Sequence, residues 1–281
     1  MNSISNLKKL QLELKNKDID IFIINRSDEF LSEYISPNAE RLQFITNFSG
    51  SAGKAIILQN DAFLYVDGRY TFQASEQINV KEIKPKHLKI FWDDLKYNLN
   101  KKNLNIALDS KLHSISEIIK IKKITKNSSK IIFLQKNIID FIWKDQPKLK
   151  YTKIFDHPIK YAGEDRSSKL KNVINYIIEN NLKHYLITGL DNIAWLLNIR
   201  ADDIKYTPLL FSHLLISQKE KPQLYVNEKK IGEKLKKKLL KHININPIEE
   251  IQNIFSNISH TDNVGLEFST TTYYFLELLQ K

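Results

Sequence analysis

Short apolar runs separated by polar segments predict alternating strands and helices in the first half of the chain. Ile19–Asn25 is a continuous apolar run, which is typical of a strand buried on both faces. The other elements predicted here are an opening helix that carries Leu7, Leu10, Leu12 and Leu14 and is capped near Ser3 or Ser5, strands at Arg41–Phe48, Lys54–Gln59, Phe63–Asp67, Asn105–Asp109 and Lys130–Leu134, and helices from Thr71 and at Phe91–Leu99, Ser114–Ile124 and Asn137–Trp143.

The segment Lys144–Ser167 differs in character, because it holds two prolines, mixed charges and no sustained hydrophobic period. A length of 281 residues favours two domains, so we place the linker in this segment and predict domains at residues 1–148 and 149–281. The elements predicted after it are helix Ser168–Asn180, strand His184–Thr188, a helical turn at Asp191–Leu197, strands Leu209–Ser217 and Gln223–Asn227, helices Lys229–Lys241 and Glu249–Asn257, strand Asn263–Phe268 and a helix from Thr270.

The two halves resemble each other in element order and in short sequence matches. The sequence LYV occurs at Leu64–Val66 and again at Leu224–Val226, 160 positions later, and NIALDS at Asn105–Ser110 matches NVGLEFS at Asn263–Ser269. We therefore predict an α/β fold built from a tandem pair of similar domains. In this alignment Lys281 corresponds to about residue 122, so the second copy is expected to lack a closing strand and helix. An unpaired sheet edge is a liability, and we interpret the chain as the front part of a longer protein.

Composition narrows the classes of function. Lys+Arg 43 against Asp+Glu 32 gives a net charge of +11, which allows nucleic acid as a partner, but the lysines are scattered and not interleaved with aromatic residues. Lys229–Lys241 carries one apolar stripe and is expected to pack on a sheet with its lysines in solvent. With Cys 0 there is neither a disulfide nor a thiolate nucleophile. No apolar stretch has the length of a signal peptide or membrane span, which predicts a cytoplasmic protein without a membrane partner.

The motifs of common catalytic and metal sites are absent from the sequence. No two of the seven histidines have the spacing of metal ligands on a helix or strand, and no phosphate-binding glycine motif occurs. Gly50–Gly53 (GSAG) is expected to be a tight turn between two strands with glycine at positive φ, and not a nucleophile elbow or phosphate cradle.

The most informative stretch is FLYVDGRY at residues 63–70, where an apolar strand ends in a turn that places Arg69 and Tyr70 at the sheet edge. Arg69 is suited to bind a carboxylate with two hydrogen bonds. The alternative is that it pairs with Asp67, Glu33 or Glu40 and tethers the loop; composition does not separate the two.

Four long segments resemble the amino-terminal part of Xaa-Pro aminopeptidase (aminopeptidase P), of the creatinase/prolidase type. They are residues 32–58 and 63–78 in the first half, FIWKDQPK at residues 141–148, and residues 189–217 in the second half. The resemblance implies two creatinase/prolidase N-terminal-like domains, each a mixed sheet flanked by helices, followed in the family by a catalytic domain. That domain holds two divalent ions, usually manganese, and a metal-bound hydroxide cleaves the bond before proline.

None of the family's five metal ligands maps to a position of this chain, so the resemblance implies no catalytic residue, no bound metal and no activity for the chain alone. It implies instead that these domains mediate dimer contacts and wall the substrate cleft, with Arg69 and Tyr70 in a cleft-facing or interdomain role. The implied partners are the chain's own or a separately encoded catalytic domain, short peptides with proline second, and a second copy. The alternative is a free-standing binding or assembly module that kept this scaffold.

The chain departs from the family pattern at a few positions. It has Phe30, Ala201 and Thr207 where many relatives have His, Gly and Asn. Ala201 argues against a positive-φ turn at that position.

Overall fold

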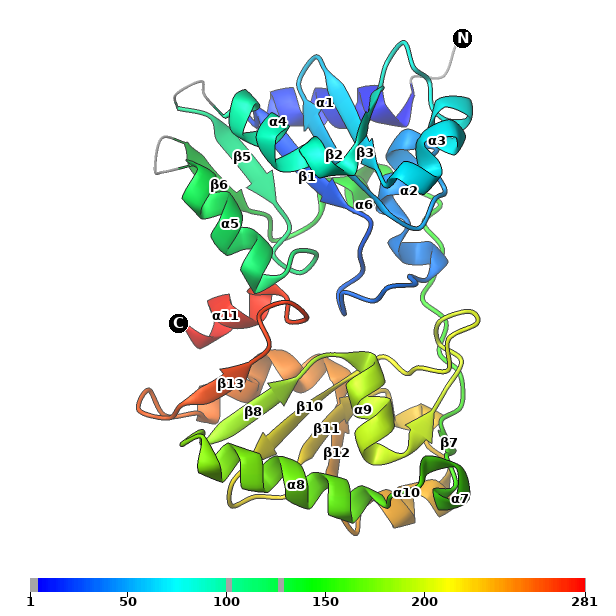
Figure 1. The fold of residues 1–281 in the computed structure, drawn as a ribbon, viewed down its shortest axis with the longest axis vertical. Coiled ribbons are helices and arrows are strands. Elements are labelled where there is room, and N and C mark those ends of the chain that lie inside the picture. The colour runs from blue at the N-terminus through cyan, green and yellow to red at the C-terminus, as the bar shows by residue number, and fades with distance from the viewer. Residues whose placement is uncertain (1–4, 100–102, 126–128, 281) are drawn as a thin grey trace. The chain divides into compact units, whose positions relative to one another are not determined.

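The computed structural model describes residues 5–99, 103–125 and 129–280, which form two compact units (Figure 1). Unit 1 comprises Met1–Glu29 and Pro37–Lys148, and unit 2 comprises Phe30–Ser36 and Leu149–Lys281. Each unit has its own sheet and its own hydrophobic core. Phe30–Ser36 belongs to unit 2 because Phe30 stacks on Phe211 and His213 there, with ring centroids 4.9 and 5.0 Å away.

Unit 1 is built on a six-stranded mixed sheet of order β4-β3-β2-β1-β5-β6. Strand β1 pairs with β2 in antiparallel and with β5 in parallel orientation. All five residues of β1 are buried, as its continuous apolar sequence predicts. The strands are β1 (Ile21–Asn25), β2 (Gly53–Leu58), β3 (Ala62–Val66), β4 (Lys84–His87), β5 (Asn105–Leu108) and β6 (Lys130–Phe133).

Helices cover both faces of this sheet (Figure 1). On one face α1, α2, α3 and α6 bury a core that includes Leu7, Leu10 and Leu14. On the other face α4 packs through Phe91, whose ring meets Tyr65 edge-on at 5.1 Å. The helices are α1 (Asn6–Asn16), α2 (Arg41–Thr46), α3 (Thr71–Gln77), α4 (Phe91–Asn98), α5 (Ile115–Thr125) and α6 (Ile138–Ile142), with short 3₁₀ turns η1 (Pro37–Ala39), η2 (Gly68–Tyr70) and η3 (Leu88–Ile90). Ser5 caps α1, as predicted; Ser3 lies outside the described residues.

The predicted strand at Arg41–Phe48 is wrong, since this segment forms the helix α2. Leu42 and Ile45, three positions apart, both face the core, which is helical spacing that a short apolar run does not reveal. The helix ends at Asn47, whose φ of 64° is left-handed.

The expected turn at Gly50–Gly53 also differs from the structure. It lies between α2 and β2, not between two strands, and neither glycine has positive φ. Gly50 is needed for space, because a Cβ there would lie 2.2 Å from Cζ of Phe48.

Unit 2 is built on a five-stranded mixed sheet of order β12-β11-β10-β8-β13. This order and its parallel and antiparallel pairings correspond strand for strand to β4-β3-β2-β1-β5, which confirms the predicted tandem pair. A counterpart of β6 is missing from the part of the chain that the structure describes. The strands are β8 (His184–Ile187), β10 (Ser212–Ser217), β11 (Gln223–Val226), β12 (Asn244–Pro247) and β13 (Val264–Leu266), and a separate two-stranded sheet joins β7 (Phe155–Asp156) to β9 (Ile199–Arg200).

Two predictions for unit 2, the irregular linker and the basic helix, differ from the structure. The predicted linker already contains β7 and a short helix, and the predicted basic helix is divided into a 3₁₀ turn and α10. Ile231 interrupts it by bridging to Ile154, and Gly232 then caps α10. Leu235 and Leu239 are buried, as the apolar stripe predicts. The helices are α7 (Ile159–Ala162), α8 (Arg166–Glu179), α9 (Leu190–Leu197), α10 (Glu233–Leu239) and α11 (Tyr273–Leu279), with 3₁₀ segments η4 (Glu228–Lys230) and η5 (Ile248–Asn257).

Among residues 5–99, 103–125 and 129–280, none of the helices has both the length and the apolar character that crossing a membrane requires.

Candidate functional site

The predicted site residues Arg69 and Tyr70 lie in η2, the 3₁₀ turn that follows β3. Asp67 caps this turn and accepts hydrogen bonds from the backbone N–H of Arg69 at 3.1 Å and from its Nε at 2.8 Å. These hydrogen bonds hold the pKa of the Asp67 carboxyl below its usual range. Of the alternatives, the structure shows Arg69 paired with Asp67, while 72% of the Arg69 side chain is exposed.

Tyr70 ties the turn to the loop before β2. Its hydroxyl forms a hydrogen bond of 2.7 Å with Oγ of Ser51, and its ring lies edge-on to Phe48 at 5.9 Å. The Arg69 guanidinium is 5.5 Å from the Tyr70 ring. Tyr70 therefore anchors the turn, and Arg69 presents a cation at its surface; their role in a cleft or between domains stays a prediction.

The turn η4 of unit 2 corresponds to η2 of unit 1, and its last residue stands where Tyr70 stands in η2. Asn227 caps it as Asp67 does in unit 1, by accepting from the backbone N–H of Lys229 at 3.2 Å. Lys230 follows in the position of Tyr70 and forms a buried ion pair with Asp203, a residue of the loop before β10. Burial lowers the pKa of Lys230, although Asp203 favours its charged form. In both units this position ties the turn to the loop before the antiparallel strand.

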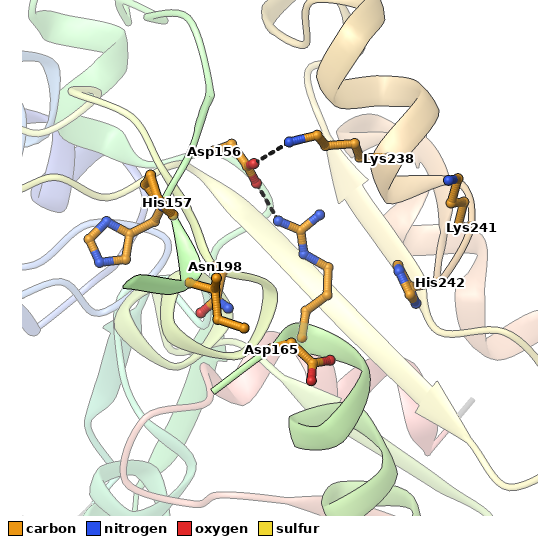
Figure 2. A pocket seen from close by; sticks show the side chains of 10 residues that line it. Asp156, His157, Asp165, Asn198, Lys238, Lys241 and His242 are labelled. Carbon is orange, nitrogen blue, oxygen red and sulfur yellow. Dashed lines mark hydrogen bonds and ion pairs between the residues drawn. The ribbon is translucent and has the colours of Figure 1, made fainter. Parts of the chain in front are cut away.

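A hollow of about 520 Å³ lies in unit 2, lined by residues of β7, α7, α8 and α10, several of them charged (Figure 2). Asp156 lies between Arg166 and Lys238, whose Nζ is 2.8 Å from the carboxylate. Asp165 caps α8 and accepts from the backbone N–H of Ser167 at 2.8 Å. His157, Lys241 and His242 complete the polar lining.

Both carboxylates of the hollow are held by hydrogen bonds from neighbouring side chains or backbone groups. Burial raises the pKa of Asp156, but hydrogen bonds from Lys238 and Arg166 outweigh it and lower the pKa overall. Hydrogen bonds from Ser167 and Ser168 lower the pKa of Asp165 to about 2. Both carboxyl groups are therefore ionised and engaged in hydrogen bonds at neutral pH.

The residues present do not fit a metal centre. Within the described ranges, no three or more His, Cys, Asp or Glu side chains come together in a group that would hold an ion. Three carboxylates that are buried or half-buried form ion pairs: Glu117 with Lys54 and His113, Asp140 with Arg41, and Asp203 with Lys230. Burial opposes the charge of Glu117, but His113 and Lys54 outweigh it and hold the pKa of Glu117 far below its usual range. These carboxylates stabilise the fold as paired anions.

A third feature, which the sequence interpretation missed, is an apolar groove of about 390 Å³ in unit 2. We call it the α8–α9 groove; its lining includes Val173, Tyr176, Tyr185, Trp195 and Leu196. Trp195 is 54% exposed, with Nζ of Lys169 4.1 Å from its ring. Trp195 was predicted to lie on a helical turn, but its exposure follows from tertiary packing and left no signal in the sequence.

Comparison with known proteins connects these features to a family. A family model described as Creatinase/Prolidase N-terminal domain matches residues 6–137, and a second with the same description matches residues 145–281. The chain belongs to the creatinase/prolidase N-terminal domain family. The predicted fold, a tandem pair of such domains, is thereby confirmed.

Relatives of this creatinase/prolidase N-terminal region are considerably longer than the chain. It is 29% identical over 266 residues to "Probable Xaa-Pro aminopeptidase P" of Laccaria bicolor, covering 93% of this chain and 41% of the relative. The protein of the same name from Aspergillus niger is 32% identical over 255 residues, covering 87% and 41%. The chain thus spans about two fifths of the length of these relatives.

A solved structure shows the same arrangement of elements. X-prolyl aminopeptidase from Caenorhabditis elegans, described as a cytosolic enzyme with a di-nuclear active site, matches with a TM-score of 0.84 and 25% identity. The match covers 92% of this chain and 44% of that one. The expected resemblance to the N-terminal region of aminopeptidase P, a metallopeptidase family, is confirmed.

Proposed function

We propose that this chain is the non-catalytic N-terminal region of a metal-dependent Xaa-Pro aminopeptidase, with residues 1–148 as domain I and residues 149–281 as domain II. The observation that carries the proposal is the match to the Caenorhabditis elegans enzyme, which extends over 92% of this chain but only 44% of that one. The proposal agrees with the side chains of the described residues, among which no three or more His, Cys, Asp or Glu gather in a group that would hold a metal ion.

In this proposal the two divalent ions, expected to be manganese, belong to a catalytic domain of the same polypeptide or of a separately encoded one. The two domains form dimer contacts and wall a cleft that admits short peptides with proline second. The exposed guanidinium of Arg69, held by Asp67 and backed by Tyr70, suits contact with a peptide carboxylate or a neighbouring domain. The proposed compartment is the cytoplasm.

The test is reconstitution of peptidase activity. The purified chain is assayed with Mn²⁺ and an X-Pro-X tripeptide, alone and after addition of a family catalytic domain that carries the metal ligands; the catalytic domain alone is the control. We expect no turnover by the chain alone, and faster turnover by the mixture than by the catalytic domain alone. Turnover by the chain alone contradicts the proposal. A folded chain that never enhances the catalytic domain supports the alternative, a free-standing binding or assembly module.

A further inference from the structure

Aligning unit 2 with unit 1 shows which positions of unit 1 correspond to the lining of the α8–α9 groove. Residues with left-handed backbone conformation serve as the reference points of this alignment. Helix α1 of unit 1 and helix α8 of unit 2 are each followed by a left-handed residue, Asp18 with φ 53° and Asn181 with φ 54°. Helix α2 of unit 1 and helix α9 of unit 2 both end in a left-handed asparagine, at Asn47 and Asn198. Counting from these landmarks matches Leu10 with Val173, Phe22 with Tyr185 and Phe44 with Trp195.

The strand pairings support this alignment independently. Phe22 of β1 lies beside Ala107 of β5, and Tyr185 of β8 lies beside Gly265 of β13. Both pairings are parallel, so β13 occupies the position of β5.

In unit 1 the three positions are covered by α6, which packs against α1 and α2. Ile138 and Ile139 of α6 belong to the same buried cluster as Leu10 and Phe22, which are 0% and 1% exposed. Just beyond α6, Trp143 stacks on Phe44, with ring centroids 4.6 Å apart and planes 14° from parallel. The sheet of unit 1 continues beyond β5, since β6 pairs in parallel with the outer edge of β5.

In unit 2 the same positions are uncovered within the described residues. Val173 and Tyr185 are partly exposed, and Trp195 is 54% exposed; all three line the α8–α9 groove. Within residues 129–280, β13 is the outermost strand of the sheet of unit 2, whereas its counterpart β5 pairs with β6. The two places that β6 and α6 occupy in unit 1, an outer strand edge and the groove beside it, are thus open together in unit 2.

We propose that unit 2 receives a strand–helix segment that adds a parallel strand to β13 and seats an amphipathic helix in the α8–α9 groove. The helix is expected to carry two adjacent aliphatic residues and an aromatic residue a few positions later, as Ile138, Ile139 and Trp143 do in unit 1. Its source is the polypeptide that carries the catalytic domain, and this assignment of the source rests on the function proposed above. The inference that a strand–helix segment fits this place rests only on the comparison of the two units and does not depend on that function.

Thiol labelling tests the docking, because the chain has no cysteine of its own. Val173→Cys places a single thiol in the groove, and Ile178→Cys places one on an exposed position of the same helix as the matched control. Each variant is extended after Lys281 by a flexible linker and a copy of residues 130–144. A tethered segment has an effective concentration of roughly millimolar, so a Kd of about 0.1 mM slows labelling of the groove thiol about tenfold.

We expect this slowing for V173C and no change for I178C. An extension with Asp in place of the two residues copied from Ile138 and Ile139 is expected to leave V173C labelling fast. Equal labelling rates with the apolar and the Asp-bearing extensions overturn the proposal. Protection of the unextended chain that grows with protein concentration overturns it in favour of a second copy as occupant.

The source of the segment is tested by a further extension that carries the residues following the matched region in the Caenorhabditis elegans enzyme. Protection by this extension supports the catalytic polypeptide as the source, and protection only by the copy of residues 130–144 overturns that assignment. None of these measurements uses peptidase activity. A failure of reconstitution and a failure of docking are therefore distinguishable.

Discussion

Removal of the buried cation Lys230 is expected to destabilise unit 2 selectively. Lys230 and Asp203 form an ion pair whose side chains are 4% and 0% exposed. Breaking a buried pair by removing one partner costs about 3–5 kcal/mol, because a buried charge is left without its counter-charge. In the Lys230→Met variant, Asp203 keeps three hydrogen bonds, from the backbone N–H and Oγ1 of Thr152 at 2.8 and 3.0 Å and from the backbone N–H of Phe211 at 3.0 Å. We therefore expect a loss of about 3 kcal/mol, at the lower end of that range.

Urea unfolding followed by circular dichroism measures this loss. With an m-value of about 2 kcal/mol/M for a unit of this size, the unfolding midpoint of unit 2 falls by about 1.5 M. Lys84→Met, at the exposed pair with Asp61, is the control and is expected to change stability by less than about 0.5 kcal/mol. A midpoint for Lys230→Met as close to wild type as that of the control refutes the reasoning, because the pair then contributes no more than a surface pair.

Three further changes have expected outcomes. Gly50→Ala brings a Cβ within 2.2 Å of the Phe48 ring and is expected to lower the stability of unit 1 by about 1–3 kcal/mol in urea titrations. Gly232→Ala in unit 2, where no atom lies within 4 Å of the added Cβ, is expected to cost less than about 1 kcal/mol, the loss of a glycine N-cap. The pKa of Glu117 is lower in the folded state than in the unfolded state, so the ionised carboxylate stabilises unit 1 fully at neutral pH, and this stabilisation is lost as the pH falls below the usual carboxyl range. The urea midpoint of the Glu117→Gln variant is therefore expected to fall less between pH 7 and pH 3 than that of the wild type. An equal fall in both proteins contradicts this. In the reconstituted enzyme, Arg69→Ala is expected to raise the KM for the tripeptide severalfold and to leave kcat unchanged. Arg69→Lys is expected to give an intermediate KM, because it keeps the positive charge. Equal KM values for the wild type and both variants refute a peptide-contacting role.

Local pattern was sufficient for most of the secondary structure. The continuous apolar run of β1 and the short strands β2, β3 and β5 follow from residues that are neighbours in sequence. The duplication was also readable, because matched segments at nearly constant spacing fold into matched strands. Local pattern failed at α2, where six residues are too few to separate a helical period from an alternating one.

Tertiary structure decided the features on which function depends. Lys230 and Asp203 are 27 positions apart, and Lys54 and Glu117 are 63 apart, so nothing local marks them as ion pairs. The exposure of Trp195 likewise has no signal in the sequence, since its counterpart Phe44 is also aromatic but is covered by Trp143, the residue after α6.

The sequence by itself determined the element order, the two related halves and the family, because these follow from the period and order of residues along the chain. Only the tertiary structure decided which charges are neutralised by partners and which apolar positions are left uncovered. The physical reason is that burial and pairing are set by what packs against a residue, and in this fold those neighbours come from distant parts of the chain.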